Sequence, residues 1–466
     1  MTPVDFIKFA MLAPIFLMAA PALGIAIKDK PAAQRAVFAV MCFMTLNGLF
    51  GPGNWGLTLA SIETYRGHTK GYHFYFNNAL AIALIIARWK ADPKGFRLVP
   101  PGVGWYLAYC GLSFLSIVNA PNTNYVIMAA HKMTFTALLA VATFNVLRTE
   151  DDLRFFMRVM AVTLIWELII CLKFKYLEGA YQVRGTFEHQ NPLAMYAVLI
   201  GSVFLAVGMG PKFKGANICM VAFVACAVIV QCTLSRAALA IFGVGVIATL
   251  GISLLEKPTG RRIMMTSGMA VMGSVGMLLA LDTIVSRFND EGNAASSELR
   301  HVMNAASKEM LHDNRLGIGW NNFALTFNPP FRYAEILWDW VRSRNMKPRE
   351  DAANPVVESH YWLLLAETGY QGFGAYVLMI VVGLWFNLRA FFDFGHSFLR
   401  CLSLGIAVGC GLNYLQSFLE RVLVQPRNLM LWLIIMGVTA RIEVMRRERR
   451  KQLKAERTAA AAPTAQ

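Results

Sequence analysis

A short polar segment with groups suited to binding and proton transfer interrupts the apolar sequence of this 466-residue chain. It reads Arg184-Gly-Thr-Phe-Glu-His-Gln-Asn191 and combines a cation, a carboxylate, an imidazole and an amide. Charged groups are costly at the rim of a bilayer unless something polar meets them there, and a guanidinium can bind two phosphate oxygens at once. The segment therefore predicts contact with a phosphate-bearing lipid.

Three other segments carry comparable groups. Arg236 has only one polar neighbour, Ser235, in an apolar stretch where a buried arginine needs an anion, and Arg300 lies in the longest hydrophilic segment. His360 begins an apolar stretch, and an unperturbed histidine pKa of about 6.5 suits proton transfer. Glu367 shares the helical face of His360 but lies about two turns away, so the two would need an intermediary.

Each of these residues also has a structural interpretation. An arginine at the end of a membrane helix usually extends its guanidinium to the interface, which applies to Arg184 and Arg236. A lone histidine such as His189 is more often a hydrogen-bonded structural residue. The residue patterns leave both interpretations open for the arginines and favour the structural one for His189.

The composition predicts that transmembrane helices position these groups. Hydrophobic residues make up 56% of the chain, charged residues make up 15%, and the mean hydropathy of +0.47 indicates too little polar surface for a soluble protein. A helix needs about 20 mostly apolar residues to cross the hydrocarbon. We expect an all-α polytopic membrane protein with 12 or 13 such spans, because charged, proline and glycine residues interrupt two of the candidates. The candidate spans lie near 4–27, 36–60, 72–89, 103–119, 125–147, 153–173, 190–209, 216–233, 236–255, 263–284, 359–388, 397–418 and 428–441.

The distribution of lysine and arginine predicts the orientation. One side of the candidate spans carries 25 of these residues, the C-terminal tail included, whereas the short loops on the other side carry 8. We therefore expect the tail in the cytoplasm and the Arg184 segment on the outer face, which is the periplasm if the cell is Gram-negative. This divides the chain into helices with short loops at 1–284, a periplasmic loop region at 285–358, C-terminal helices at 359–445 and a basic tail at 446–466.

Several classes of function are disfavoured. The formal net charge of +16 is mostly accounted for by the cytoplasmic loops and the tail, so we exclude nucleic acid as a partner. The tail either lies on anionic membrane lipids or only flanks the last span. All eight cysteines fall in or next to apolar spans, and the chain lacks CxxC and HExxH spacings and a glycine-rich phosphate loop. We therefore expect no disulfide framework, metal or other cofactor.

Four motifs in one order carry a family resemblance. The first two are Arg184-Gly-Thr-Phe-Glu-His-Gln-Asn-Pro-Leu-Ala194 and Leu234-Ser-Arg-Ala-Ala238. Arg300 and Leu316-Gly-Ile-Gly-Trp-Asn-Asn-Phe323 follow, and Ser359-His-Tyr-Trp-Leu-Leu-Leu-Ala-Glu-Thr-Gly-Tyr-Gln-Gly372 is the last. Together they resemble the bacterial O-antigen ligase and polysaccharide polymerase superfamily, whose members are multi-span glycosyltransferases that act on lipid-linked glycans outside the inner membrane.

The resemblance implies a donor glycan linked to undecaprenyl pyrophosphate, which is already a good leaving group. Arg184, Arg236 and Arg300 would bind the pyrophosphate and stabilise the charge that develops on its leaving oxygen. His360 would accept the proton of the attacking sugar hydroxyl, and this direct attack would invert the anomeric centre without a metal. A carboxylate nucleophile, Glu188 or Glu358, would imply retention and is less favoured. The residues expected to support the site are Glu188, His189, Asn191, Ser235 and Glu367.

Several functions fit these features. The leading interpretation is a ligase that transfers O-antigen to lipid A-core in lipopolysaccharide biosynthesis. A polymerase of the same superfamily and a protein O-glycan ligase share the donor and the cations, so the sequence does not separate the three. A secondary transporter would place ionisable groups near the bilayer midplane on paired broken repeats. Lys132, Glu167 and the Gly51-Pro-Gly53 break fit transport, but we detect no internal repeat.

Overall fold

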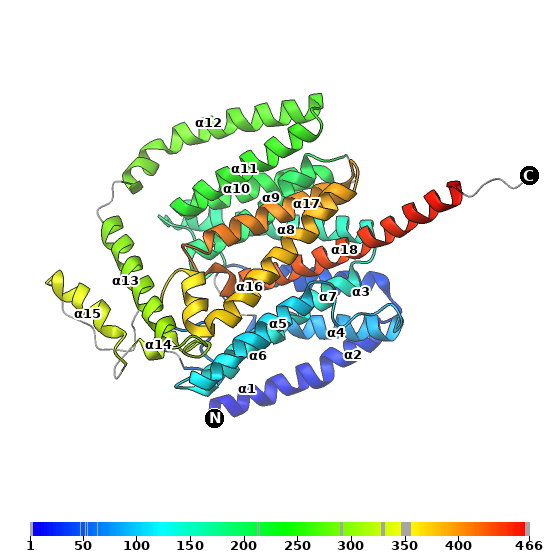
Figure 1. Cartoon of the computed structure of the whole chain (residues 1–466). Helices are drawn as coiled ribbons and strands as arrows, with labels where there is room; N and C mark the ends of the chain where they lie inside the picture. Colours follow the sequence, from blue (N-terminus) through cyan, green and yellow to red (C-terminus); the bar gives the residue numbers. More distant parts are fainter. Residues whose placement is uncertain are drawn as a thin grey trace, which may run out of the picture.

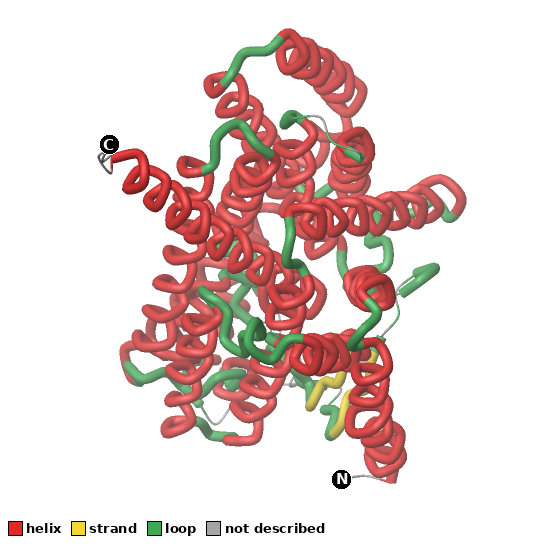
Figure 2. Tube along the Cα trace, turned by 90° about the vertical axis from the view of Figure 1, so that its right-hand side faces the viewer, coloured by secondary structure: helices red, strands yellow, loops and turns green. Residues whose placement is uncertain are grey.

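The chain folds into an almost entirely helical bundle with one short hairpin of strands (Figure 1, Figure 2). The computed structural model describes residues 3–46, 48–51, 53, 55–62, 64–211, 213, 215–288, 292–327, 331–345 and 356–461. The α-helices and strands are α1 (Pro3–Pro14), α2 (Ala20–Ile27), α3 (Pro31–Phe43), β1 (Gly56–Leu59), β2 (Tyr72–Tyr75), α4 (Phe76–Ala91), α5 (Val103–Phe114), α6 (Thr123–Thr136), α7 (Leu138–Val146), α8 (Glu150–Leu172), α9 (Gln190–Gly208), α10 (Ala216–Thr233), α11 (Arg236–Glu256), α12 (Gly260–Phe288), α13 (Gly292–Asp313), α14 (Phe323–Thr326), α15 (Ala334–Ser343), α16 (His360–Asp393), α17 (Phe398–Gln416) and α18 (Pro426–Ala461).

Helix α9 forms the core of the bundle. Its sequence is apolar on all sides, as expected for a helix with no face toward water or lipid, and it packs against α10, α11 and α17. The contact with α17 is close because small residues face it. A Cβ at Gly405 would lie 2.5 Å from Val203 Cα, and one at Gly409 would lie 3.1 Å from Leu199 C. Glycine at these positions therefore allows the two backbones to approach.

The chain is an all-α, multi-pass membrane protein. Within the described residues, nine helices are long and apolar enough to cross a membrane. They are Val4–Ile27, Thr123–Val146, Glu150–Leu177, Gln190–Gly208, Ala216–Thr233, Arg236–Glu256, His360–Asp393, Phe398–Gln416 and Pro426–Thr458. Shorter apolar helices lie at Pro31–Phe43 and Val103–Asn119. The candidate span at 263–284 falls within α12, whose side chains are only partly described, so a total of 12 or 13 spans stays a prediction.

Two of the candidate spans are wrong in part, because strands replace helix. The helix expected near 36–60 ends at Phe43, and β1 pairs with β2 as an antiparallel hairpin. The sequence of β2 is Tyr-His-Phe-Tyr, and aromatic residues favour strands. Lys8 donates to Thr58 O at 3.1 Å, and Asp5 accepts from the Ala60 N–H at 3.0 Å. The charges that interrupt the first span therefore hold the hairpin against α1.

The hydrophilic segment 285–358 is largely helical where the structure describes it, although a loop region was expected. It contains α13, α14 and α15, and the amphipathic α15 packs its apolar side against α13. These helices lie at one end of the bundle, and the C-terminal part of α18 projects from the opposite end (Figure 1). The basic tail thus continues α18 and is separated from the hydrophilic segment by the length of the bundle.

Helix α16 is interrupted near its start by a loop from the hydrophilic segment. Gly369 has φ +66° and ψ −171°, and the Tyr370 N–H donates to Arg315 O at 3.2 Å. A Cβ at Gly369 would lie 2.7 Å from Leu316 Cα, and one at Gly317 would lie 2.6 Å from Glu367 C. Both glycines also have positive φ, which residues with a side chain rarely adopt. The glycine-containing loop therefore packs into the break in α16.

Candidate functional site

A buried carboxylate holds the Arg184 segment. Glu167 of α8 is fully buried and accepts from the backbone N–H and the hydroxyl of Thr186, each at 2.8 Å. Gly185 has φ +54°, and a Cβ at this position would overlap Glu167 Oε1. The Arg184 side chain is exposed, and within the described residues no acceptor pairs with its guanidinium. The fold thus fixes the backbone of Arg184 and leaves its charge available.

Arg236 begins α11 directly beside this segment. The Val183 N–H donates to Cys232 O at 3.1 Å, which joins the residue before the Arg184 segment to the last turn of α10. Ser235 is buried at the start of α11, and Arg236 is half-buried. This hydrogen bond therefore links the residue before Arg184 to the helix end that precedes Arg236.

His189 and Asn191 form the start of α9. His189 Nδ1 accepts from the Asn191 N–H at 3.3 Å, so the imidazole caps the helix. Asn191 Nδ2 donates to Glu420 Oε1 at 2.7 Å, and Glu188 is exposed. Partial burial lowers the pKa of His189, and the Glu358 carboxylate opposes this shift. His189 therefore makes a structural contact at the start of α9, and its role in supporting the site stays a prediction.

His360 is buried at the start of α16. Its side chain is 1% exposed, its N–H donates to Ser417 O at 2.9 Å, and its ring meets the Tyr376 ring edge-on with centroids 5.2 Å apart. Nδ1 has no hydrogen-bond partner in the described part of the chain. A buried polar atom without a partner costs about 1–3 kcal/mol. A ligand hydroxyl that reached this nitrogen would recover that free energy.

Arg300 of α13 is already paired with a carboxylate. Its Nε lies 2.5 Å from Glu358 Oε2, and the two side chains are 41% and 51% exposed. Exposed ion pairs of this kind contribute about 0–1 kcal/mol. A phosphate group can therefore compete with Glu358 for this guanidinium.

Glu367 contacts the glycine-containing loop. Its fully buried carboxylate accepts from the N–H groups of Asn321 at 2.9 Å and Phe323 at 3.1 Å, and from His68 Nε2. Within the described residues it makes no hydrogen bond to His360. Its support of His360 is thus indirect: it fastens two loops to the helix that begins with this histidine.

The connection between α17 and α18, residues 417–425, links the expected segments to one another. Ser417 accepts from His360, and Glu420 accepts from Asn191. Burial and the Glu358 carboxylate raise the pKa of Glu420 to about 7, and the Asn191 hydrogen bond opposes this shift. No sequence motif marks this connection, because its hydrogen-bond partners lie far away in the chain.

The loop between β1 and β2 adds groups that residue spacing did not reveal. Arg421 Nη1 donates to Arg66 O at 3.4 Å. Lys132 Nζ donates to His68 O and to Val424 O, each at 2.7 Å. Lys132 and Val424 are 292 positions apart, so no local pattern could have paired them.

Comparison with known proteins names no relative. A scan against protein-family models and a search of curated proteins found no match to the chain. In the part of the chain that the structure describes, no group of three or more His, Cys, Asp or Glu side chains is placed to hold a metal ion. The groups that the site gathers are guanidinium, imidazole, carboxylate and amide, which suit anion binding and proton transfer.

Proposed function

We propose that the chain is a membrane glycosyltransferase that moves a glycan from undecaprenyl pyrophosphate to a hydroxyl of lipid A-core in lipopolysaccharide biosynthesis. The observation that carries the proposal is the meeting of polar segments that lie far apart in the chain. The Val183–Cys232, Asn191–Glu420 and His360–Ser417 hydrogen bonds join three of them, and the Arg300–Glu358 ion pair joins the fourth.

The chemistry follows from the types of these groups. The donor pyrophosphate would bind Arg184 and Arg236, whose charges stabilise the leaving oxygen. As the acceptor oxygen bonds to the anomeric carbon, the bond from that carbon to the phosphate oxygen breaks, and its electron pair leaves with the pyrophosphate. The hydroxyl proton passes to His360. Attack from the opposite face inverts the anomeric centre.

We place this site on the periplasmic face of a bacterial inner membrane and the basic tail in the cytoplasm. The excess of lysine and arginine on the side of the tail supports this orientation. The projection of α18 away from α13, α14 and α15 is consistent with it (Figure 1).

Transport receives less support from the contacts. Glu167 and Lys132 were the ionisable residues that fitted it. Glu167 instead holds Thr186, and Lys132 joins two loops through backbone carbonyls. A polymerase and a protein O-glycan ligase would use the same site as the lipid A-core ligase.

An acceptor assay tests the proposal. Purified full-length protein is incubated with lipid-linked glycan and with lipid A-core, a second lipid-linked glycan or a peptide. We expect product with lipid A-core and no product with the second lipid-linked glycan or the peptide. The His360→Ala variant should give no product but still bind donor, whereas His312→Ala, which removes an exposed histidine of α13, should match the wild type.

Other outcomes of this assay identify the alternatives. Product with the second lipid-linked glycan would make the chain a polymerase, and product with the peptide would make it a protein ligase. Flux of lipid-linked glycan across liposomes without bond formation would contradict an enzyme. Normal transfer by His360→Ala would remove the assignment of the base.

A further inference from the structure

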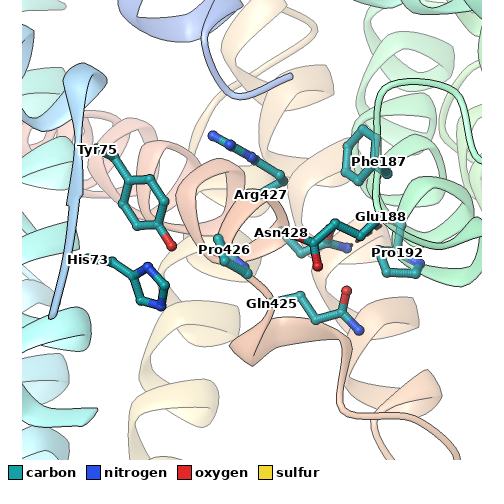
Figure 3. Close-up of a pocket in the computed structure, with 9 residues that line it drawn as sticks. All are labelled: His73, Tyr75, Phe187, Glu188, Pro192, Gln425, Pro426, Arg427 and Asn428. Carbon is teal, nitrogen blue, oxygen red and sulfur yellow. Dashed lines mark hydrogen bonds between the residues drawn. The ribbon is translucent and has the colours of Figure 1, made fainter. Parts of the chain in front are cut away.

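A small cavity lies between β2, the start of α9 and the start of α18 (Figure 3). Its volume is about 70 Å³, which is room for about five water-sized units. A phosphate group, with one phosphorus and four oxygens, is of this size. None of the three expected pyrophosphate-binding arginines lines the cavity. Its walls are His73, Tyr75, Phe187, Glu188, Pro192, Gln425, Pro426, Arg427 and Asn428.

Two buried cations lie at or near this cavity. Arg427 lines it, is 6% exposed and lies 5.5 Å from the centroid of the Tyr75 ring. Lys132 does not line it but is 3% exposed, and its ammonium donates to His68 O and to Val424 O, which precedes the lining residue Gln425. An ammonium has three N–H groups, and among the described residues no carboxylate lies within ion-pair distance of Lys132. A buried ammonium such as that of Lys132 is costly unless an anion lies nearby.

The other walls are suited to an anion. Helices α9 and α18 both begin here, and the start of a long helix carries a partial positive charge. Asn428 is 2% exposed, its Nδ2 donates to Pro192 O at 3.1 Å, and its Oδ1 has no partner in the described part of the chain. This oxygen suits a ligand that also carries a hydroxyl, such as a protonated phosphate.

His73 adds no charge of its own. Burial lowers its pKa to about 3, and Lys132 and Arg427 act in the same direction. Its Nδ1 shares a hydrogen bond of 2.8 Å with Thr58 Oγ1, which fixes the ring in the hairpin. Glu188 is the one acidic residue among the lining residues, and it is exposed. The cavity is therefore lined by one buried cation, Arg427, and one exposed carboxylate, and Lys132 adds a second buried positive charge from outside the lining.

We propose that this cavity binds a phosphate group, with Arg427 as the cation in its wall, Lys132 as a second positive charge nearby and Glu188 opposing the bound charge. Only the source of the phosphate rests on the proposed function. If the chain acts on a polyprenyl pyrophosphate, the group is a phosphate of that lipid or of the released product. Free phosphate or pyrophosphate is the other source.

Calorimetric titration of the full-length protein in detergent at fixed ionic strength tests the site. One arm uses inorganic pyrophosphate, and the other uses farnesyl diphosphate. We expect Arg427→Gln to weaken binding at least tenfold. Glu188→Gln should tighten it roughly threefold to tenfold, because it removes a carboxylate a few ångströms from the bound charge. Arg389→Gln, which removes a half-buried arginine at the far end of α16, is the matched control and should bind as the wild type does.

Tighter binding by Glu188→Gln could not be explained by misfolding, since a damaged protein does not gain affinity. Equal affinities in the wild type, Arg427→Gln and Glu188→Gln would overturn the proposal. Tighter binding of farnesyl diphosphate than of pyrophosphate assigns the site to the lipid, and equal binding assigns it to the free anion. If the affinities of Arg427→Gln and Glu188→Gln change as expected but no acceptor receives glycan, the phosphate site stands and the proposed function fails. If transfer proceeds and the variants bind as the wild type does, the phosphate site alone fails.

Discussion

Replacing Gly185 by alanine tests whether Glu167 holds the Arg184 segment in place. Gly185 has φ +54°, and the added Cβ would overlap Glu167 Oε1 and lie 3.1 Å from Cys171 Sγ. A left-handed conformation costs a residue with a side chain about 1–2 kcal/mol. If the segment moves away, Thr186 loses two hydrogen bonds to a carboxylate, each worth about 1.5–3 kcal/mol. The two effects together come to about 4–8 kcal/mol.

Gly179→Ala is the matched control for this substitution. Gly179 has φ +68°, but a Cβ there would meet nothing within 4 Å. It therefore carries the conformational cost of about 1–2 kcal/mol without the clash. We expect thermal unfolding in detergent to show a small decrease in Tm for Gly179→Ala and a much larger one for Gly185→Ala. Glycan transfer should fall at least about a hundredfold in Gly185→Ala alone, which is the usual loss when one charge-stabilising donor is misplaced.

Two results would refute this reasoning. Equal decreases in Tm for the two variants would show that the Glu167 contact does not hold the segment. A large decrease in Tm with normal transfer would show that the position of Arg184 does not matter for the reaction. Thr186→Val, which removes one of the two hydrogen bonds and adds no clash, should lie between the two glycine variants in both measurements.

Two further predictions concern charge. Arg184→Lys and Arg236→Lys should each lower transfer at least tenfold, because a point charge does not reproduce the bidentate guanidinium; wild-type rates in both would exclude a pyrophosphate role. Burial raises the folded-state pKa of Glu420 from 4.5 to about 7, so its contribution to stability is full below pH 4.5 and is lost as the pH rises through 7. Glu420→Gln keeps the uncharged form, so its Tm should rise relative to the wild type between pH 5 and pH 8. An equal difference in Tm at the two pH values would contradict the shift.

Hydropathy was sufficient to predict the class of protein and the positions of most of its long helices. The candidate spans near 190–209 and 397–418 match α9 and α17 closely, because an apolar stretch of helix length is a local property. Hydropathy gave the wrong structure at β1 and β2, since a short run of apolar and aromatic residues suits a strand as well as a helix. The strands form where Asp5 and Lys8 supply partners for the hairpin, and those partners are about 50 residues away.

The site was predictable only in its residue types. Arginine, histidine and amide side chains in an apolar chain indicated where polar chemistry would occur, and the bundle brings four of these segments together. The connection containing Glu420, and the cavity that contains Arg427, had no motif to mark them. Both arise where helix ends from distant parts of the sequence converge.

Glu367 shows what the sequence determined and what only the tertiary structure decided. Its sequence position predicted a place on the same helix face as His360, and the structure retains that helix. Its hydrogen-bond partner is His68, 299 positions away, and it also binds the loop at Asn321. Helical periodicity and hydropathy are properties of neighbouring residues, so they predict helices, buried faces and polar interruptions. Partners across a bundle depend on how the helices pack, which is the sum of many contacts over the whole chain.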